Sequence, residues 1–306
     1  MTDPNQPPPP SLDPNKPNRN EDKPSKIGGQ SSYINYSMNT FGFEPRQFHP
    51  YMLPNNFSSI IYGQRRSGKT TWVSWFLYWF QCRFRELYVF SSTAFNGHYQ
   101  EFAPEWHVFP RFREDILQMI IENQKAIMGV ECVGGTSCAG DGQFSKQRFK
   151  TNSKSFIDKR PICIILDDVL DTIKDLRRSV ALNTVFSMGR HLNMAVIVCT
   201  QYPTALPPSF RMNVDLAVIF NTHSFKVRDI VFRDYAHNLP SWKFYGALDY
   251  FTRNFQSLCV MPCTQSNDLR DLFFVSKAED HGPFSIGRSL RQAKKETEQP
   301  LRLFSQ

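Results

Sequence analysis

Residues 58–76 read SSIIYGQRRSGKTTWVSWF and place a glycine-rich turn between an apolar run and an aromatic-rich segment. Gly63, Gly68, Lys69 and Thr70 have the spacing G-x-x-x-x-G-K-[ST] within this stretch. The pattern predicts a strand, then a loop whose backbone N–H groups surround phosphates, then a helix. In such a loop the lysine reaches the β- and γ-phosphates and the threonine hydroxyl is a ligand of Mg²⁺. The sequence therefore predicts a site for ATP and Mg²⁺. The residues expected to contact the nucleotide are Gly63, Gln64, Arg65, Arg66, Ser67, Gly68, Lys69, Thr70 and Thr71.

A second apolar run, Pro161–Leu166, ends in two adjacent acids, Asp167 and Asp168. A carboxylate at the end of such a strand can hold Mg²⁺, and the next carboxylate can polarise an attacking water. Paired acids also serve as helix caps or turn residues, and many enzymes of this kind have a glutamate at the second position. With the glycine-rich loop upstream, we expect Asp167 to be a metal ligand and Asp168 to activate water.

A third apolar run ends in Gln201, within MAVIVCTQ at 194–201. If its strand lies beside the strand that precedes the loop, the amide of Gln201 can orient water and sense the γ-phosphate. The alternative is a surface polar residue that opens a turn at Tyr202-Pro203.

Short apolar runs alternate with longer amphipathic segments, which is typical of an α/β fold with a mostly parallel sheet and helices on both faces. The expected strands are Ser59–Tyr62, Leu87–Ser91, His107–Phe109, Ile162–Leu166, Ala195–Thr200, Leu216–Phe220 and Leu258–Met261. The expected helices are Lys69–Arg83, Arg113–Met128, Leu176–His191, Ser224–Ala236 and Trp242–Asn254.

The ends of the chain and one internal segment differ from this pattern. Eight of the first 30 residues are proline, so we expect residues 1–40 to be a disordered arm before a domain at 41–280. A glycine-rich stretch at 129–155 carries Lys146, Arg148, Lys150 and Lys154, and is expected to be a flexible basic insertion. Residues 281–306 form a basic C-terminal tail. The chain of 306 residues has a net charge of +8. Basic flexible segments can bind a polyanion such as DNA, and the alternative is that they are solvated loops.

Composition also excludes several classes of protein. The longest nearly unbroken apolar run, at 72–80, is half the ~20 residues that cross a bilayer, so no membrane span is expected. The N-terminus lacks the basic and apolar regions of a secretory signal. We therefore expect the seven cysteines to be reduced thiols in the cytoplasm or nucleus.

Four short motifs in order resemble one family. They are 63–70, Leu166-Asp167-Asp168, Gly189-Arg190-His191 and Val198-Cys199-Thr200-Gln201, and the resemblance extends over roughly residues 45–275. The chain is similar to the DNA-packaging ATPases of large double-stranded DNA viruses, the poxvirus-type branch of the FtsK–HerA superfamily. The resemblance implies a RecA-like core with an additional strand, and a ring, commonly of six copies, that hydrolyses ATP to move duplex DNA into a preformed capsid. It also implies contact with the capsid or its portal region, at virus assembly sites in the host cytoplasm or nucleus, or in the virion.

The resemblance further implies an arginine that reaches the nucleotide of a neighbouring subunit. Arg190 or Arg211 fits that role, and an ordinary salt bridge is the alternative for each. Arg65 and Arg66, inside the loop, could instead contact the γ-phosphate of their own subunit.

Two other functions remain open from the sequence. A P-loop nucleotide kinase would be expected to have an arginine-rich lid rather than a strand that ends in Gln201. A scaffold or DNA-binding protein could bind ATP without hydrolysing it.

Overall fold

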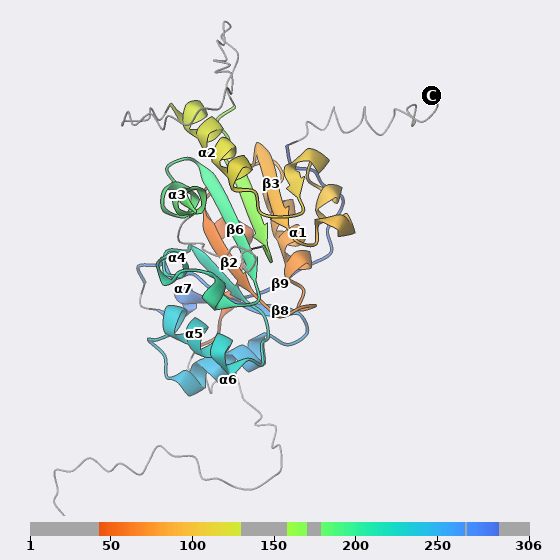
Figure 1. The fold of residues 1–306 in the computed structure, drawn as a ribbon. Helices are drawn as coiled ribbons and strands as arrows, with labels where there is room; N and C mark the ends of the chain where they lie inside the picture. The colour runs from red at the N-terminus through yellow and green to blue at the C-terminus, as the bar shows by residue number, and fades with distance from the viewer. Residues whose placement is uncertain (1–42, 130–157, 170–178, 267, 288–306) are drawn as a thin grey trace, which may run out of the picture. The chain divides into compact units, whose positions relative to one another are not determined.

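The computed structural model describes residues 43–129, 158–169, 179–266 and 268–287 (Figure 1). The predicted arm at 1–40, the basic insertion except for Gly129, and the tail beyond residue 287 lie outside these ranges. The described part of the chain contains the whole glycine-rich loop, both acids and Gln201.

Nine strands form one sheet in the order β1-β9-β8-β7-β2-β6-β5-β3-β4. Their bounds are β1 Arg46–Gln47, β2 Ser58–Tyr62, β3 Glu86–Ser91, β4 Val108–Phe109, β5 Ile162–Asp167, β6 Met194–Thr200, β7 Leu216–Ile219, β8 Gln256–Val260 and β9 Phe273–Lys277. The strands from β7 to β4 are parallel to their neighbours, whereas β8 is antiparallel to both β7 and β9. The strand before the loop, β2, is separated from the acid-bearing β5 by β6. This is the predicted additional-strand order.

Helices cover both faces of the sheet. They are α1 Lys69–Phe80, α2 Glu114–Met128, α3 Val180–Met188, α4 Pro208–Arg211, α5 Phe225–Tyr235, α6 Ser241–Phe251 and α7 Leu269–Leu272, with short 3₁₀ turns η2 Pro50–Met52, η3 Ala94–Asn96, η4 Tyr99–Glu101, η5 Glu105–His107 and η8 Pro203–Ala205. No helix in the described ranges is long and apolar enough to cross a membrane.

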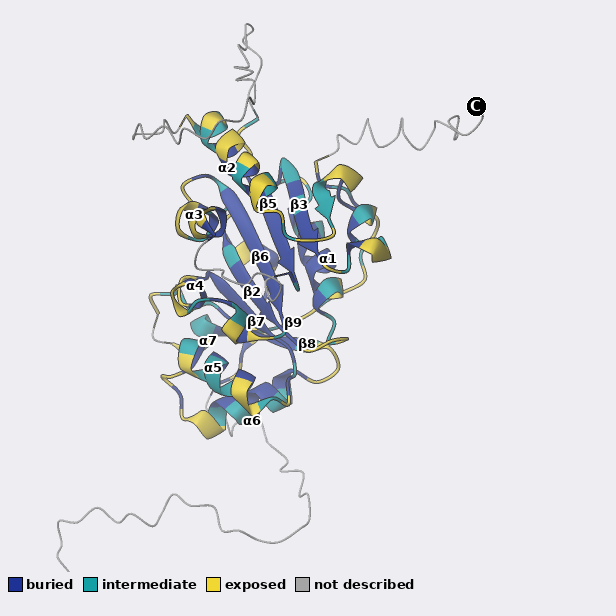
Figure 2. Ribbon diagram, viewed as in Figure 1, coloured by how far each residue is buried: buried dark blue, intermediate teal, exposed yellow. Residues whose placement is uncertain are grey.

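The sheet divides the core into two layers. Alternate side chains of a strand point to opposite faces, so Ile164 of β5 belongs to the core layer that also contains residues of α2, α3, α5 and α6, whereas Ile165 belongs to the layer that contains residues of α1. The sheet centre is buried from both sides (Figure 2). Trp72 and Phe76 of α1 are fully buried and stack with ring centroids 4.9 Å apart. The aromatic segment after the loop is therefore core, and it fixes the loop's helix against the sheet. The predicted α/β class with helices on both faces is confirmed.

Several predicted bounds were wrong. α1 ends at Phe80 rather than Arg83, and α6 ends at Phe251 rather than Asn254. α3 ends at Met188, so Arg190 lies in a turn and not on the helix that leads to β6. The Gly189 N–H bonds to Val185 O, and the Met194 N–H bonds back to Gly189 O, which turns the chain directly into β6.

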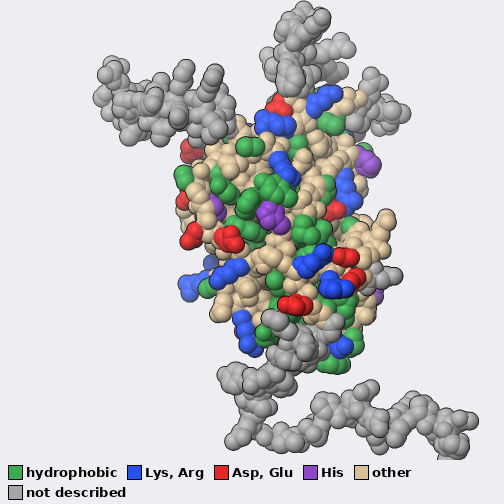
Figure 3. Space-filling model, turned by 180° about the vertical axis from the view of Figure 1, so that it is seen from behind, with side chains coloured by type: hydrophobic (Ala, Val, Ile, Leu, Met, Phe, Trp, Pro, Cys, Tyr) green, Lys and Arg blue, Asp and Glu red, His purple; other side chains and the backbone are tan. Residues whose placement is uncertain are grey.

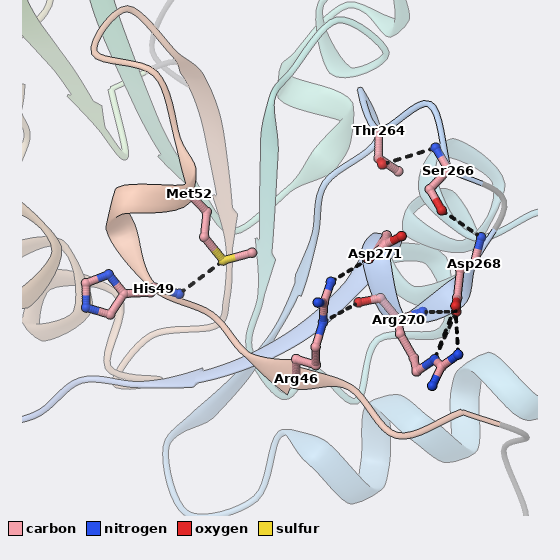
Figure 4. A network of polar contacts seen from close by, with 8 residues as sticks. All are labelled: Arg46, His49, Met52, Thr264, Ser266, Asp268, Arg270 and Asp271. Carbon is pink, nitrogen blue, oxygen red and sulfur yellow. Dashed lines mark hydrogen bonds and ion pairs between the residues drawn. The ribbon is translucent and has the colours of Figure 1, made fainter.

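The edge strand β1 and its neighbour β9 were not predicted. The Phe48 N–H donates to Val275 O at 2.8 Å, which extends the pairing of β1 with β9. Figure 4 shows the side chains at this edge, where Arg46 Nε donates to Arg270 O at 3.1 Å and Arg46 also pairs with Asp271. Because both members of the ion pair are about half exposed, the backbone pairing contributes more to the position of β1 than the charges do.

Candidate nucleotide site

The glycine-rich loop leaves the carboxyl end of β2 and enters α1. A Cβ atom at Gly63 would lie 2.4 Å from Ser67 Oγ and 3.1 Å from side-chain atoms of Lys69 and Phe220, so any larger residue would displace its neighbours. Gly68 has φ +96°, a left-handed conformation that L side chains rarely adopt. Arg66 also has a positive φ, 63°, which turns the loop back toward the helix. The sequence spacing thus corresponds to a tight backbone turn at a helix N-terminus, which is the geometry that binds phosphate.

The Lys69 side chain is folded back onto this loop. Its Nζ donates to Gly63 O at 2.8 Å and to Gln64 O at 3.1 Å, and the residue is buried. The cation is therefore held at the mouth of the loop by two neutral carbonyls. Phosphate oxygens are stronger acceptors for an ammonium group than carbonyls are.

The other loop residues lie at different depths. Gln64, Arg65 and Arg66 are exposed, as is Thr71, whereas Ser67 and Thr70 are half-buried. The Ser67 hydroxyl is buried and has no hydrogen-bond partner among the described residues. A phosphate oxygen in the loop would supply one.

Three adjacent strand ends bring the other predicted residues to the loop. Tyr62 pairs with Thr200 in the register of β2 and β6, and Cys199 pairs with Asp167 in the register of β6 and β5. Gly63 follows Tyr62, Gln201 follows Thr200, and Asp168 follows Asp167. Gln201 Nε2 donates to Asp168 Oδ2 at 3.0 Å. The amide and the second acid therefore form one hydrogen-bonded unit beside the loop.

Asp167 lies deeper than Asp168. It is 4% exposed, and its Oδ2 accepts from Tyr99 OH at 2.9 Å and from Ser91 Oγ at 3.1 Å. Burial raises the pKa of Asp167, while the bond from Tyr99 lowers it. Asp168 is half-buried, with φ 48°, and its Oδ1 has no partner within the described structure. One acid is thus fixed in place, and the other has a buried oxygen without a partner among the described residues.

The donor set suits Mg²⁺. Thr70 and Asp167 provide a hydroxyl and a carboxylate, both hard oxygen ligands, and Mg²⁺ commonly takes one or two protein ligands together with phosphates and waters. Within the described ranges no group of three or more His, Cys, Asp or Glu side chains could hold a metal alone. A Mg²⁺ ion at this site would therefore share its ligands with the nucleotide.

Two residues of the site were not predicted. Ser91 ends β3 and Tyr99 begins η4, and both donate to Asp167. Neither belongs to a motif, because their partner is 68 to 76 residues away along the chain. The pairing of β3 with β5, which places Ser91 opposite Asp167, is the feature that could have indicated Ser91.

Replacing Tyr99 by phenylalanine is expected to weaken the response to Mg²⁺. The change removes one of the two hydroxyls that hold Asp167, and loss of such a supporting contact typically costs about 10-fold in metal affinity. The measurement is the Mg²⁺ concentration that gives half-maximal nucleotide hydrolysis. Tyr88→Phe is the matched control, because Tyr88 OH donates to Glu86 near the other end of β3. An unchanged Mg²⁺ requirement in Tyr99→Phe would show that Ser91 alone positions the acid.

Arg211 is committed to its own chain. Its Nε donates to Asp234 at 2.6 Å and its Nη1 donates to Leu206 O at 2.7 Å, and the side chain is 10% exposed. These bonds brace the segment that follows Gln201 against α5. Within the described structure Arg211 therefore makes the ordinary salt bridge that was the alternative for this residue, and these contacts support the subunit from inside.

Arg190 is half exposed and lies at the amino ends of the strands, whereas the loop lies at their carboxyl ends. Its Nη2 donates to Asp215 Oδ1 at 2.7 Å, and Asp215 also accepts from the N–H of Ser58, the first residue of β2. The five residues of β2 separate the amino ends of the strands from the carboxyl ends by about 16 Å. Arg190 is therefore too far away to act on the nucleotide of its own chain.

The two arginines are expected to differ in their effect on stability. Arg211→Ala leaves the Asp234 carboxylate, whose side chain is 12% exposed, without its ion-pair partner and should lower the free energy of unfolding by about 3 kcal/mol. Arg190→Ala removes a half-exposed arginine, and Asp215 keeps the bonds that it accepts from the N–H and hydroxyl of Ser58, so the loss should be about 1 kcal/mol or less. Urea denaturation of both variants measures the difference. Equal losses would contradict the buried, structural role of Arg211.

Relatives of the chain occur among viruses. It is 25% identical over 232 residues to uncharacterized protein 088R of Invertebrate iridescent virus 3, covering 74% of this chain and 78% of that protein. It is 22% identical over 226 residues to uncharacterized protein 015R of Frog virus 3 (isolate Goorha), covering 72% of this chain and 61% of that protein.

The fold is also similar to a solved viral structure. The genome packaging NTPase B204 of Sulfolobus turreted icosahedral virus 2, in complex with AMPPCP, superposes with a TM-score of 0.50 at 13% identity, covering 74% of this chain and all of that one. At this identity the likeness concerns the fold.

The family assignment rests on the sequence profile described as Poxvirus A32 protein. This profile matches residues 46–236, from β1 to the end of α5, and so includes the glycine-rich loop, both acids and Gln201. The chain belongs to the poxvirus A32 protein family.

Proposed function

We propose that this chain is an ATP-hydrolysing motor that moves double-stranded viral DNA into a capsid. The observation that carries the proposal is the meeting of the phosphate loop, Asp167 and the Asp168–Gln201 pair at three adjacent strand ends, in a chain of the poxvirus A32 family. The fold similarity to B204, whose structure is described as that of a genome packaging NTPase, supports the same function. The relatives among viruses are consistent with action at virus assembly sites. We propose the capsid or its portal region as the partner there.

In the proposed reaction, the oxygen of a water molecule attacks the γ-phosphorus of ATP and the bond to the β–γ bridging oxygen breaks. Asp168 accepts the proton of the water through its unpaired Oδ1, and ADP leaves with the bonding electrons. Lys69 and the loop N–H groups stabilise the charge that develops on the phosphate oxygens. Mg²⁺, held by Thr70 and Asp167, would offset the charge of the β- and γ-phosphates.

Gln201 links this chemistry to the rest of the subunit. Its amide donates to Asp168, and the segment that follows it is braced by Arg211. An amide in this position can orient the water and change partners when the γ-phosphate leaves. The η8 to α4 segment would then receive the signal of hydrolysis.

We propose that the active subunits form a ring, commonly of six copies in the resembling family. Arg190 is the remaining candidate for the arginine that acts on a neighbour. Arg190 lies at the amino ends of the strands, away from its own loop. It can therefore contact a nucleotide only in a second copy of the chain. In a ring, Arg190 would exchange Asp215 for the phosphate charge of the adjacent site.

The proposed DNA contact is the basic segment at 129–155. Over the described residues on the face in Figure 3, lysine and arginine side chains alternate with acidic ones rather than gather in one patch. The sequence, in contrast, concentrates Lys146, Arg148, Lys150 and Lys154 in one stretch just before β5. Contacts to DNA phosphates from there would accept any base sequence, as packaging requires.

Changing these four residues to glutamine is expected to lower the salt dependence of DNA binding. Each lost phosphate contact reduces the slope of log K against log salt by about 0.9, while hydrolysis without DNA stays near its original rate. Fluorescence anisotropy with a duplex at several salt concentrations measures the slope. Lys226→Gln with Lys243→Gln, on α5 and α6, is the control pair. An unchanged slope in the fourfold variant would exclude the segment and direct attention to the tail beyond residue 287.

Phosphate release with and without duplex DNA tests the proposed function. A packaging motor hydrolyses ATP faster when DNA is present. Transfer of phosphate to a nucleoside or nucleotide would identify a kinase, and ATP binding without release would identify a scaffold. Either of these results would contradict the proposal.

A further inference from the structure

A cavity of about 500 Å³ lies beside the phosphate loop, and the wall that faces the loop has no part in the chemistry described above. Residues 66–72 form one wall, and Phe220, Phe255, Lys277 and Ala278 form the rest. Phe220 follows β7, Phe255 precedes β8, and Lys277 ends β9. These strands lie on one side of β2, whereas β6 and β5, which carry the catalytic residues, lie on the other side. The loop therefore has the hydrolytic residues on one flank and this cavity on the other.

Phe255 stands at the cavity in an unusual conformation. It lies in the turn between α6 and β8, has φ 61°, follows Asn254 at φ 53°, and is 67% exposed. A bulky residue with positive φ is a genuine outlier, and strain of this kind persists only where the surrounding structure imposes it. Burial of an apolar ring does not account for it, because most of the ring is in contact with solvent.

The ring of Phe255 is directed to the phosphate loop. Its Cδ1 atom lies 3.5 Å from the position that a Cβ of Gly68 would occupy, and Phe220 Cε1 lies 3.7 Å from the same point. Two aromatic rings thus flank the last glycine of the loop, one of them buried and the other presenting its surface to the cavity.

A nucleotide bound in the loop has a direction. Its γ-phosphate must face Asp168 and Gln201, so its base and ribose extend to the opposite flank, where the cavity lies. Cavities of this size hold small ligands, and an aromatic ring is a stacking surface for every base. The polar side chains that line the cavity in the described structure are hydroxyls and cations, from Arg66, Ser67, Lys69, Thr70, Thr71 and Lys277. No lining residue in the described structure is Asp, Glu, Asn or Gln, whose fixed carboxylate or amide groups can discriminate one base edge from another.

We propose that this cavity is the nucleobase site and that Phe255 is its stacking surface. The inference rests on the proposed nucleotide-hydrolysing function and adds the substrate class. Purine nucleoside triphosphates bind better than pyrimidine ones, because their bases offer more stacking area. ATP and GTP bind about equally, because the lining has no carboxylate or amide side chain and its hydroxyls can donate to or accept from either purine.

Isothermal titration of the full chain with Mg²⁺ tests this proposal. The titrants are ATP, GTP, CTP and inorganic tripolyphosphate, the last of which has no base. Phe255→Ala is expected to raise the Kd for ATP about 10-fold, as loss of one stacking contact does, and to leave the Kd for tripolyphosphate unchanged. Phe255→Trp should restore ATP binding. The matched control is Phe225→Ala, since Phe225 is 69% exposed on α5 and does not line the cavity.

Phe255→Leu keeps an apolar side chain in the turn but removes the flat ring, and it serves if the alanine variant fails to fold. It should also bind ATP more weakly and tripolyphosphate normally. Equal ATP binding by the original chain and the folded variants would overturn the stacking role. An equal loss for tripolyphosphate would overturn it too, because Phe255 would then support the loop. A preference of more than about 10-fold for ATP over GTP would show that the protein reads the hydrogen-bonding edge of the base, which contradicts the proposal. If the unaltered chain binds neither ATP nor tripolyphosphate, the proposed function itself fails.

Discussion

Lys69→Ala is expected to abolish measurable ATP hydrolysis and to weaken ATP binding. Lys69 Nζ is buried at the mouth of the loop, with two carbonyl partners at 2.8 and 3.1 Å. It is therefore placed to donate hydrogen bonds to the phosphate oxygens both in the bound nucleotide and in the transition state. Loss of one such preorganised donor costs about 10²- to 10³-fold in kcat, and loss of the ground-state contact raises the Kd as well.

Steady-state phosphate release and ATP titration measure the two effects of Lys69→Ala separately. Lys226→Ala, an exposed lysine on α5, is the control and should behave as the original chain does. Retention of more than about a tenth of the original kcat by Lys69→Ala would contradict the assignment of the loop.

Asp168→Asn is expected to leave ATP binding intact and to remove turnover. Asparagine has the same shape, tolerates the positive φ of this position, and can accept the bond from Gln201 Nε2 through its amide oxygen. It cannot take a proton from water at neutral pH. Loss of a general base typically costs about 10²- to 10⁴-fold in rate, with little change in the Kd for ATP.

Asp229→Asn, in an exposed pair on α5, is the control for removal of a carboxylate elsewhere. The same two assays apply. If Asp168→Asn hydrolyses ATP at the original rate, the base is another residue, and Asp167 becomes the next candidate. A large rise in the Kd for ATP would instead indicate a structural role for Asp168.

The fold and the loop were predictable because their signals are local. Buried parallel strands such as β5 and β6 are nearly continuous apolar runs, and all seven strands drawn from the sequence are present, with shifts of one or two residues at their ends. The order of β2, β6 and β5 then follows from the resemblance, and it places Asp168 and Gln201 beside the loop. Long-range pairing produces the rest. β1 is a two-residue strand that exists only through β9, more than 200 residues away.

The parts of the site that were missed depend on tertiary partners. Tyr99 and Ser91 have a role only because the fold brings them to Asp167. Arg211 has the residue type of a catalytic arginine, but Asp234 and the carbonyls of 203 and 206 hold it inside the subunit. Phe255 is one of 27 phenylalanines, and only its backbone conformation and its place at the cavity distinguish it. The sequence shows which charged and aromatic side chains are present, but not which of them already have partners inside the folded chain.

The most direct test of the motor is displacement of a third strand from duplex DNA. A triplex-forming oligonucleotide is bound to one end of a linear duplex, and its release is followed by fluorescence after ATP is added to the full chain. A translocating ATPase predicts release that requires ATP and a length of duplex beside the triplex on which the protein can load, and that is absent with Lys69→Ala or with AMPPCP in place of ATP. ATP hydrolysis without displacement, at protein concentrations that saturate the DNA, would contradict the account.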